Sequence, residues 1–206
     1  MTTRIKVCGL TTPGQAVAAA EAGVDAIGLV FWPESSRALS PERAREIAAA
    51  VPPLVTVVGL FMNARAADVD AVLAQVPLDL LQFHGQETDA FCRAFERRYI
   101  KAIGMSGGQD PEPLAQDFPG AAGLLVDAHA GDRAGGSGES FDWSRLPRTL
   151  AARCILAGGL SPENVAEAIR TVRPWGVDVS SGVESSPGVK DSERIRRFVS
   201  EVRNVG

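Results

Sequence analysis

Residues 4–11 read Arg4-Ile5-Lys6-Val7-Cys8-Gly9-Leu10-Thr11, an apolar run with Ile and Val at alternate positions that stops at a cysteine and a glycine. Alternation of this kind is typical of a β-strand. Thr12 then places a hydroxyl directly before Pro13, a combination that marks the start of a helix. The stretch therefore predicts a strand, a short loop and a helix, with the thiol of Cys8 at the carboxyl end of the strand.

The same unit of strand and helix recurs along the chain. Gly23 is expected to end the first helix, because glycine is favoured just past a helix end. Side chains that cap later helices are expected at Ser40, Asn63, Ser161 and Asp191. Helices are expected over residues 13–22, 41–51, 64–75, 87–97, 143–151, from 162 and 192–203. Strands after the first are expected over residues 24–31, 55–61, 79–83, 99–103, 122–126, 154–157 and 176–179.

Eight strands that alternate with seven or eight helices predict an α/β fold in which all strands are parallel. The simplest architecture for that count is a closed (β/α)8 TIM barrel, and 206 residues lies near its lower size limit. The alternative is an open, doubly wound sheet, which would leave an edge strand without a helix. No linker interrupts the series, so residues 1–206 are expected to form a single domain.

Composition narrows the function classes. The net charge is −4, and no long block of Lys and Arg is present, so nucleic acid is not an expected partner. The three cysteines, Cys8, Cys92 and Cys154, are widely separated and form no CxxC pair, which argues against a disulfide framework and a structural zinc site. No apolar run approaches the length of a membrane span, and no signal segment opens the chain. A soluble, cytoplasmic protein is therefore expected.

In a closed parallel barrel, the reactive side chains lie at the carboxyl ends of the strands and in the loops that follow. The polar and small residues expected there are Cys8, Arg37, Gln82, His84, Asp127, Gly158, Gly159, Asp178, Ser180, Ser181 and Gly182. They include an ionisable thiol, a carboxylic acid, a fixed cation and two loops of small residues. Such a set suits proton transfer on a small, anionic, phosphorylated substrate.

Two loops are candidates for a phosphate site. Gly158-Gly159 precedes the helix expected from residue 162, and Ser180-Ser181-Gly182 follows the last strand. Small residues let backbone N–H groups approach an anion, and a helix N-terminus adds the positive end of its dipole. The loops after strands seven and eight are the usual phosphate cradle of this fold. The alternative is a pair of tight turns that need glycine for backbone reasons alone.

The other candidates each have a structural alternative. Cys8 is either a reactive thiol or a small buried hydrophobe. Asp127 ends an apolar strand, and it is either a general acid kept protonated by burial or a turn cap. Arg37 either clamps a substrate carboxylate or lies solvated. A lone His84 suits a structural role, and no metal site is expected there. The glycine-rich loop over residues 127–142 is a candidate for a moving lid.

Several ordered blocks of sequence resemble the phosphoribosylanthranilate isomerase family, and the resemblance extends over essentially the whole chain. The blocks are Lys6-Val7-Cys8-Gly9-Leu10-Thr11, Gly59-Leu60-Phe61-Met62-Asn63, Leu81-Gln82-Phe83-His84-Gly85, Leu125-Val126-Asp127, Gly135-Gly136-Ser137-Gly138, Leu156-Ala157-Gly158-Gly159-Leu160, residues 176–184 and Pro187-Gly188-Val189-Lys190-Asp191. Any one block would be a weak signal, whereas the full ordered set is specific.

The resemblance implies a (β/α)8 barrel of tryptophan biosynthesis that works without a cofactor. It implies an Amadori rearrangement of N-(5-phosphoribosyl)anthranilate to 1-(2-carboxyphenylamino)-1-deoxyribulose 5-phosphate. In the family pattern, Asp127 is at the position of the general acid and Cys8 is at the position of the general base. Arg37 matches the contact to the anthranilate carboxylate, the two small-residue loops match the phosphate site, and Asp178 matches a polar group near the ribose.

Two alternatives remain at the level of sequence. The related isomerase family of histidine biosynthesis performs the same rearrangement on an aminoimidazole ribonucleotide, but it has two similar half-barrels and places Asp where Cys8 stands. This chain shows no convincing half-repeat, which disfavours that alternative. A barrel that binds a phosphorylated ligand without catalysis is the other alternative, and the presence of both an acid and a base counts against it. The resemblance leaves the oligomeric state open between a monomer and a homodimer.

Overall fold

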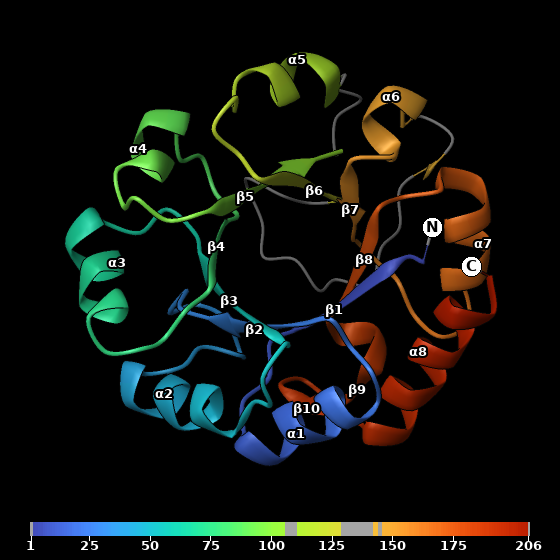
Figure 1. Cartoon of the computed structure of the whole chain (residues 1–206), viewed down its shortest axis with the longest axis horizontal. Helices are drawn as coiled ribbons and strands as arrows, with labels where there is room; N and C mark the ends of the chain where they lie inside the picture. Colours follow the sequence, from blue (N-terminus) through green and yellow to red (C-terminus); the bar gives the residue numbers. More distant parts are fainter. Residues whose placement is uncertain (1, 106–110, 129–141, 144–145, 206) are drawn as a thin grey trace.

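The computed structural model describes residues 2–105, 111–128, 142–143 and 146–205. Eight parallel strands form a closed barrel in chain order (Figure 1). The strands are β1 (Arg4–Cys8), β2 (Ala26–Val30), β3 (Thr56–Phe61), β4 (Leu80–Phe83), β5 (Tyr99–Gly104), β6 (Gly123–Asp127), β7 (Cys154–Leu156) and β8 (Gly176–Val179). Because β1 pairs with both β2 and β8, the barrel is closed. The predicted TIM barrel is therefore confirmed, and the open sheet is excluded.

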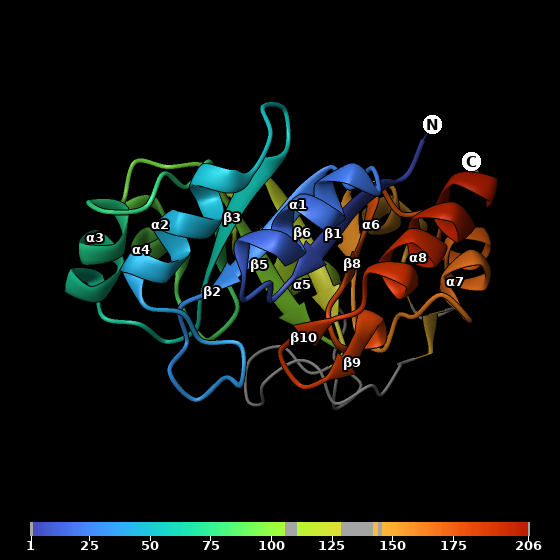
Figure 2. The same ribbon diagram turned by 90° about the horizontal axis from the view of Figure 1, so that it is seen from below.

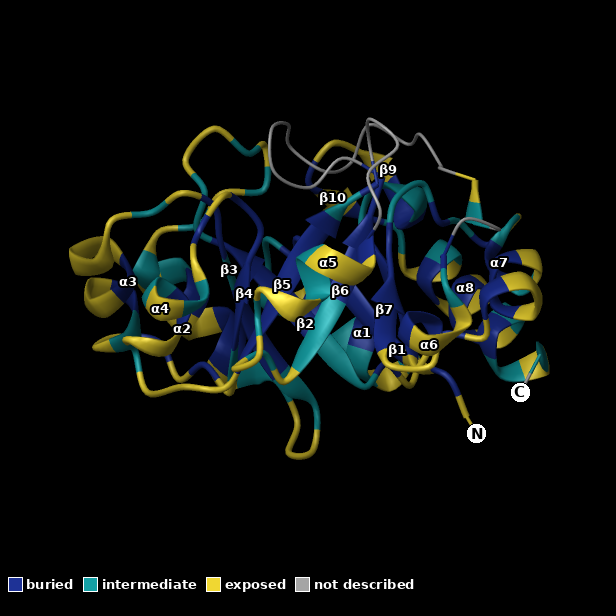
Figure 3. Ribbon diagram, turned by 90° about the horizontal axis from the view of Figure 1, so that it is seen from above, coloured by how far each residue is buried: buried dark blue, intermediate teal, exposed yellow. Residues whose placement is uncertain are grey.

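Helices surround the barrel on the outside (Figure 1). They are α1 (Pro13–Glu21), α2 (Pro41–Ala50), α3 (Ala66–Leu73), α4 (Asp89–Arg93), α5 (Pro111–Gln116), α6 (Arg148–Ala151), α7 (Val165–Val172) and α8 (Ser192–Val205). The strands are buried, whereas the outer faces of the helices are exposed (Figure 3). This burial on both faces explains why the strands read as nearly continuous apolar runs in the sequence.

The apolar core divides into two clusters. The larger cluster contains side chains from the strands and from the inner faces of the helices, such as Val7, Ile47 and Phe198. The smaller cluster lies on alternate strand positions, at Val58, Ile100, Ala102, Leu125, Ile155 and Ala157. Alternation along a strand sends neighbouring side chains to opposite faces, so the second cluster fills the barrel interior. The reactive side chains stand above this filled interior rather than in a pore.

Three of the five predicted helix caps are correct, including Thr12, whose side chain accepts a hydrogen bond from Gln15 N at the start of α1. The side chain of Ser40 accepts a hydrogen bond from the Arg43 backbone N–H at the start of α2. Asp191 Oδ1 accepts from the backbone N–H groups of Glu193 and Arg194, at 2.8 and 3.1 Å. All three side chains thus satisfy N–H groups that have no partner within their own helix.

The caps predicted at Asn63 and Ser161 are wrong. The residue before α3 is Arg65, while Asn63 has a positive φ of 51° and its Oδ1 accepts from Gln86 N at 2.7 Å. Ser161 opens a turn, and α7 begins only at Val165. In that turn Asn164 Oδ1 accepts from Ser161 N at 2.8 Å. Ser161 Oγ accepts from Glu163 N at 3.2 Å in the same turn, so in both cases the capping-type side chain holds a loop instead of a helix.

Several helices are shorter than predicted, and the difference is largest for α4 and α6. α4 begins after Thr88 because Glu87, expected in its first turn, instead accepts hydrogen bonds from Asn63 N and Gly85 N. α6 begins after Pro147, because the residue before a proline is disfavoured in the helical region. The segment proposed as a lid lies for the most part outside the described residues, as does the block Gly135-Gly136-Ser137-Gly138.

A feature that the sequence did not predict is a short antiparallel hairpin between β8 and α8. Its strands are β9 (Glu184–Ser186) and β10 (Val189–Lys190). The hairpin lies beside the barrel at the end where the strands finish (Figure 2). It therefore adds residues of the last loop to the end of the barrel where the candidate site is expected.

The helix cap Asp191 and the turn residue Ser161 are expected to contribute differently to the free energy of unfolding. Asp191→Ala should lower the free energy of unfolding by about 1 kcal/mol, because two backbone N–H groups of α8 lose their acceptor. Ser161→Ala should cost less than half as much, because its hydroxyl serves a turn. Urea unfolding of both variants beside the wild type measures the difference, and equal costs would contradict these cap assignments.

Candidate active site

The predicted site residues lie together in one cavity at the carboxyl ends of the strands. Of the eleven, only Gly182 is not part of the cavity lining. The residues that line the cavity are Cys8, Val30, Trp32, Ser35, Arg37, Leu60, Met62, Gln82, His84, Asp127, Ala157, Gly158, Gly159, Leu160, Asp178, Val179, Ser180 and Ser181. Polar groups from β1, β4, β6 and β8 thus share a cavity with apolar side chains from β2 and β3.

The thiol of Cys8 sits in a space that depends on a glycine. A Cβ added at Gly28 would stand 2.6 Å from Cys8 Sγ, so a larger residue on β2 would displace the sulfur. Burial raises the pKa of Cys8, because the thiolate loses solvation, and the nearby negative charge of Asp178 adds to the increase. The positive charges of Lys6 and Lys190 act in the opposite direction. The resting thiol is therefore mainly protonated at neutral pH.

Lys6 and Asp178 form a buried ion pair beside this thiol. Lys6 Nζ lies 2.9 Å from Asp178 Oδ1, and both side chains are less than 10% exposed. Burial by itself lowers the pKa of Lys6 and is the largest single effect, but the charges and hydrogen bonds of Asp178 and Cys8 together outweigh it and leave the pKa raised. The ammonium group is thus charged, and it opposes the burial that raises the pKa of Asp178 overall. Lys6 was not predicted as a site residue. The only sequence signal for it was a charged residue at a strand position that faces the barrel interior.

His84 is oriented between Gln82 and Asp127. Gln82 Nε2 lies 3.0 Å from His84 Nδ1, and His84 Nε2 lies 4.0 Å from Asp127 Oδ2. Burial lowers the pKa of His84 and so favours the neutral imidazole, although the negative charge of Asp127 acts in the opposite direction. Within the described residues, His84 Nε2 and Gln82 Oε1 are buried without a hydrogen-bond partner. Such atoms are expected to find partners on a polar ligand, because unpaired buried polar groups are costly.

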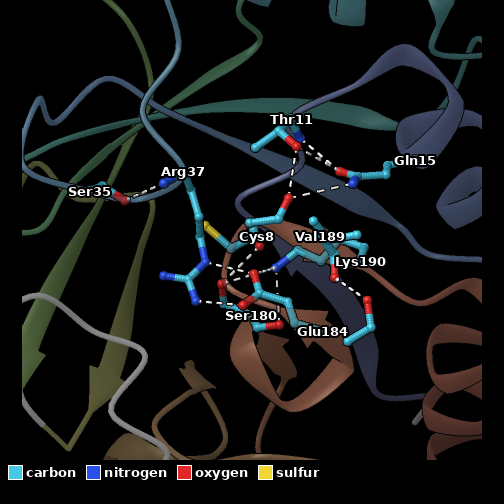
Figure 4. Close-up of polar contacts among 11 residues, drawn as sticks. Cys8, Thr11, Gln15, Ser35, Arg37, Ser180, Glu184, Val189 and Lys190 are labelled. Atoms are coloured by element: carbon cyan, nitrogen blue, oxygen red, sulfur yellow. Dashed lines mark hydrogen bonds and ion pairs between the residues drawn. The ribbon is translucent and has the colours of Figure 1, made fainter.

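Arg37 is held from one side by Glu184 of β9 (Figure 4). Its Nε and Nη2 donate to Glu184 Oε1 and Oε2, each at 2.7 Å, in a bidentate pair. Lys190 Nζ lies 2.7 Å from Glu184 Oε1. Burial alone would raise the pKa of Glu184, but the hydrogen bonds from Arg37 and Lys190 lower it overall, so Glu184 is ionised. Neither Glu184 nor Lys190 was predicted as a site residue.

The two small-residue loops approach each other closely. Gly158 and Gly159 have φ values of 83° and 66°, a left-handed conformation that favours glycine. Gly182 lies behind the cavity lining, where an added Cβ would stand 1.9 Å from the Leu160 carbonyl oxygen. The expectation that Gly158-Gly159 directly precedes a helix N-terminus is wrong, because α7 starts only at Val165. Any phosphate contact in this loop would therefore depend on backbone N–H groups more than on the α7 dipole.

The sequence of this chain is similar to the sequences of known proteins over almost its whole length. The family model for N-(5'phosphoribosyl)anthranilate (PRA) isomerase matches residues 5–201. The chain belongs to this family. It is 58% identical to the N-(5'-phosphoribosyl)anthranilate isomerase of Acidithiobacillus ferrooxidans, over 97% of each chain. The members of this family are isomerases of tryptophan biosynthesis, and this chain is an enzyme of that kind.

Solved structures of the family share the fold. The dimeric phosphoribosylanthranilate isomerase of Thermotoga maritima, described in a monomeric form, aligns with a TM-score of 0.83 at 37% identity, over 98% of this chain and 99% of that one. A phosphoribosyl anthranilate isomerase in complex with reduced 1-(o-carboxyphenylamino)-1-deoxyribulose 5-phosphate aligns equally well, at 38% identity and the same coverage. The ligand of that relative is a phosphorylated sugar derivative attached to a carboxyphenyl group.

Within the described residues, no three side chains of the His, Cys, Asp or Glu types are grouped to hold a metal ion. None of the described helices is long and apolar enough to cross a bilayer.

The surroundings of Cys8 predict how its thiol titrates. We expect the free protein to form the Cys8 thiolate with a pKa above the ordinary value of 9.0, and Asp178→Asn to lower that pKa by removing a negative charge. Thiolate absorbance, corrected by subtracting the Cys8→Ser protein, measures both. The subtraction also removes the contributions of Cys92 and Cys154, whose pKa values burial raises to about 12. Wild-type titration below pH 9, or a higher pKa in Asp178→Asn, would contradict the electrostatic description.

Proposed function

We propose that this chain catalyses the Amadori rearrangement of N-(5-phosphoribosyl)anthranilate to 1-(2-carboxyphenylamino)-1-deoxyribulose 5-phosphate. The observation that carries the proposal is the placement of Cys8 and Asp127 in one cavity, on the non-adjacent strands β1 and β6. An acid and a base on separate strands can act on different atoms of one bound sugar. No cofactor is required, because the reaction moves protons within one molecule.

The first step assigned to Asp127 is protonation of the furanose ring oxygen. The C1–O bond then breaks, the ring oxygen becomes the C4 hydroxyl group, and a cationic Schiff base forms between C1 and the anthranilate nitrogen. His84 Nε2 lies 4.0 Å from Asp127 Oδ2, so a sugar oxygen between the two could contact both groups. Asp127 is buried at the end of β6, and it lines the cavity in which the sugar would bind.

In the second step Cys8 removes the proton from C2. The electron pair moves toward the iminium nitrogen and gives an enolamine, which tautomerises to the ketone. Burial gives the Cys8 thiol a raised pKa at rest. The cationic Schiff base offers a physical reason why the thiolate can still form, since a positive charge nearby lowers a thiol pKa. The thiol forms no covalent bond to the substrate in this mechanism.

The remaining residues are proposed to bind the substrate. Arg37 would contact the anthranilate carboxylate, and Trp32 lines the cavity on the same loop, where an aromatic ring could pack. Gln82, His84 and Asp178 would contact the ribose. The phosphate would bind at Gly158, Gly159, Ser180, Ser181 and Gly182, the loops that follow β7 and β8.

The acid and base assignments predict a specific pattern of activity. Cys8→Ala and Asp127→Asn should each lower kcat by about a hundredfold or more, because each removes a proton-transfer group. Both should still bind the reduced product analogue within a few-fold of the wild type. Cys92→Ala is the matched control, because its thiol is buried outside the cavity. Near-wild-type turnover by purified Cys8→Ala would rule out the base assignment.

Complementation separates this proposal from its alternatives. Expression should restore growth of a tryptophan auxotroph that lacks this isomerase step, and the Cys8→Ala gene should not. Turnover measured on both substrates tests the histidine-pathway alternative, which predicts conversion of the aminoimidazole ribonucleotide. Tight binding of the product analogue without turnover of fresh substrate would support the non-catalytic alternative. A cytoplasmic location and the absence of a nucleic-acid partner stay predictions.

For the oligomeric state we propose a homodimer, as described for the Thermotoga relative. Leu54 is fully exposed in the loop between α2 and β3, which projects beyond the amino-terminal end of the barrel (Figure 2). Trp175 is 53% exposed, and both residues border a cavity of about 290 Å³ lined mainly by apolar side chains. Large exposed apolar side chains beside such a cavity suit contact with a second copy.

The homodimer predicts a concentration-dependent mass. Light scattering should give twice the monomer mass, and Leu54→Asp should shift it to the monomer, because a charge in an apolar interface is costly. Val189→Asp is the control, since Val189 is also an exposed apolar residue but lies on the hairpin at the opposite end of the barrel. A monomeric wild type at all concentrations would contradict the proposal.

A further inference from the structure

Glu184 occupies one side of the Arg37 guanidinium and leaves another side open. Its two oxygens accept from Nε and Nη2 at 2.7 Å each, so the edge formed by these two nitrogens is filled. Nη1 points away from Glu184 (Figure 4). A guanidinium has a second edge, formed by Nη1 and Nη2, that can bind another carboxylate in the same bidentate manner. Arg37 is thus held by one carboxylate while it keeps an edge for a second.

Lys190 connects this pair to the ends of the neighbouring strands β8 and β1. Its side chain is completely buried. Nζ lies 2.7 Å from Glu184 Oε1, 3.0 Å from the Ser180 carbonyl oxygen and 3.2 Å from Ser180 Oγ. Ser180 Oγ in turn donates to the Cys8 carbonyl oxygen at 3.0 Å. A continuous set of hydrogen bonds therefore runs from Arg37 through the hairpin to the ends of β8 and β1.

The charges of these side chains explain why a lysine is needed. Glu184 alone would neutralise Arg37 and weaken its attraction for an anion. With Lys190 added, the group carries two positive charges and one negative charge, so a net positive charge remains for a ligand. Both Arg37 and Glu184 are largely buried, so this charge is only weakly screened by solvent.

The hairpin itself is fixed by the first two barrel loops. Thr11 Oγ1 donates to the Gly188 carbonyl oxygen at 2.8 Å. A Cβ added at Gly188 would stand 3.0 Å from the Ser36 carbonyl oxygen, so the hairpin turn also lies close to the Arg37 loop. A Cβ at Gly9 would stand 2.4 Å from Arg37 Cδ, which shows that the arginine stem crosses Gly9. These contacts leave Arg37 little freedom to move.

We propose that Glu184, supported by Lys190, is a positioning residue that aims the open edge of Arg37 at the carboxylate of the substrate. The proposal rests on the proposed function, in which that carboxylate belongs to the anthranilate ring. Selectivity for an aryl ring that bears a carboxylate then depends on the β9–β10 hairpin as well as on Arg37. The hairpin residue acts through Arg37 and does not itself touch the substrate.

Binding of two ligands by calorimetry tests this proposal without any need for turnover. One ligand is reduced 1-(o-carboxyphenylamino)-1-deoxyribulose 5-phosphate, and the other is the same compound without the ring carboxylate. Glu184→Ala should weaken binding of the first by about tenfold or more, the usual effect of losing a hydrogen bond to a charged group. Binding of the second should change less than about threefold, because that ligand does not use Arg37.

A double-mutant cycle separates positioning from a merely structural role. If Glu184 acts through Arg37, the Arg37→Ala/Glu184→Ala protein should bind the carboxylate ligand no more weakly than Arg37→Ala alone. Glu184→Gln is included because Glu184→Ala leaves Lys190 buried without its counter-charge and could unfold the chain. The amide keeps the shape and one acceptor oxygen, so it should give a smaller loss, again confined to the carboxylate ligand. Thermal unfolding of each variant confirms that the fold is retained.

Three results would overturn the proposal: equal weakening of both ligands, no weakening of either, or losses that add in the double mutant. The proposed function fails separately, if the wild type binds the carboxylate ligand selectively but does not convert fresh N-(5-phosphoribosyl)anthranilate. In that case the positioning role of Glu184 would stand while the reaction assignment would fall.

Discussion

The pairing of β1 with β8 is the contact on which the cavity depends. Parallel pairing in this register places Lys6 beside Asp178 and Val7 beside Val179. Residues that are 172 positions apart in the chain thereby form a buried ion pair at 2.9 Å. The same closure brings the end of β1 to the loop after β8, where Ser180 donates to the Cys8 carbonyl oxygen. Without the pairing of β1 with β8, the Cys8 thiol would have neither its charged neighbours nor the small-residue loop beside it.

The buried charges at the cavity come in pairs, which limits their cost in free energy. An isolated charge in the interior would lose several kcal/mol of solvation, and removing one partner of a buried pair typically costs about 3–5 kcal/mol. Lys6 is paired with Asp178, and Glu184 with both Arg37 and Lys190. The raised pKa of Cys8 reflects the same environment, since burial favours the neutral thiol more than the nearby cations favour the thiolate. In the proposed mechanism, the positive charge of the Schiff base then helps the Cys8 thiolate to form.

The sequence was sufficient for the barrel because each strand, buried on both faces, left an apolar run that periodicity detects. The position of Cys8, His84 and Asp127 at strand ends likewise follows from the barrel once the strands are known. Partners at long range could not be predicted, because nothing local relates Arg37 to Glu184 across 147 positions. The hairpin was missed because its two strands have only three and two residues. Asn63 and Ser161 were misread because a residue type that suits a helix cap suits a loop equally well.

The central claim is that Cys8 takes the proton from C2 of the opened sugar. Single-turnover kinetics with freshly prepared substrate that carries deuterium at C2 address this step alone. If Cys8 is the base, we expect a primary isotope effect in the wild type. We also expect the single-turnover rate of product formation by Cys8→Ala to be lower by at least about a hundredfold. Formation of product by Cys8→Ala at the wild-type single-turnover rate would contradict it.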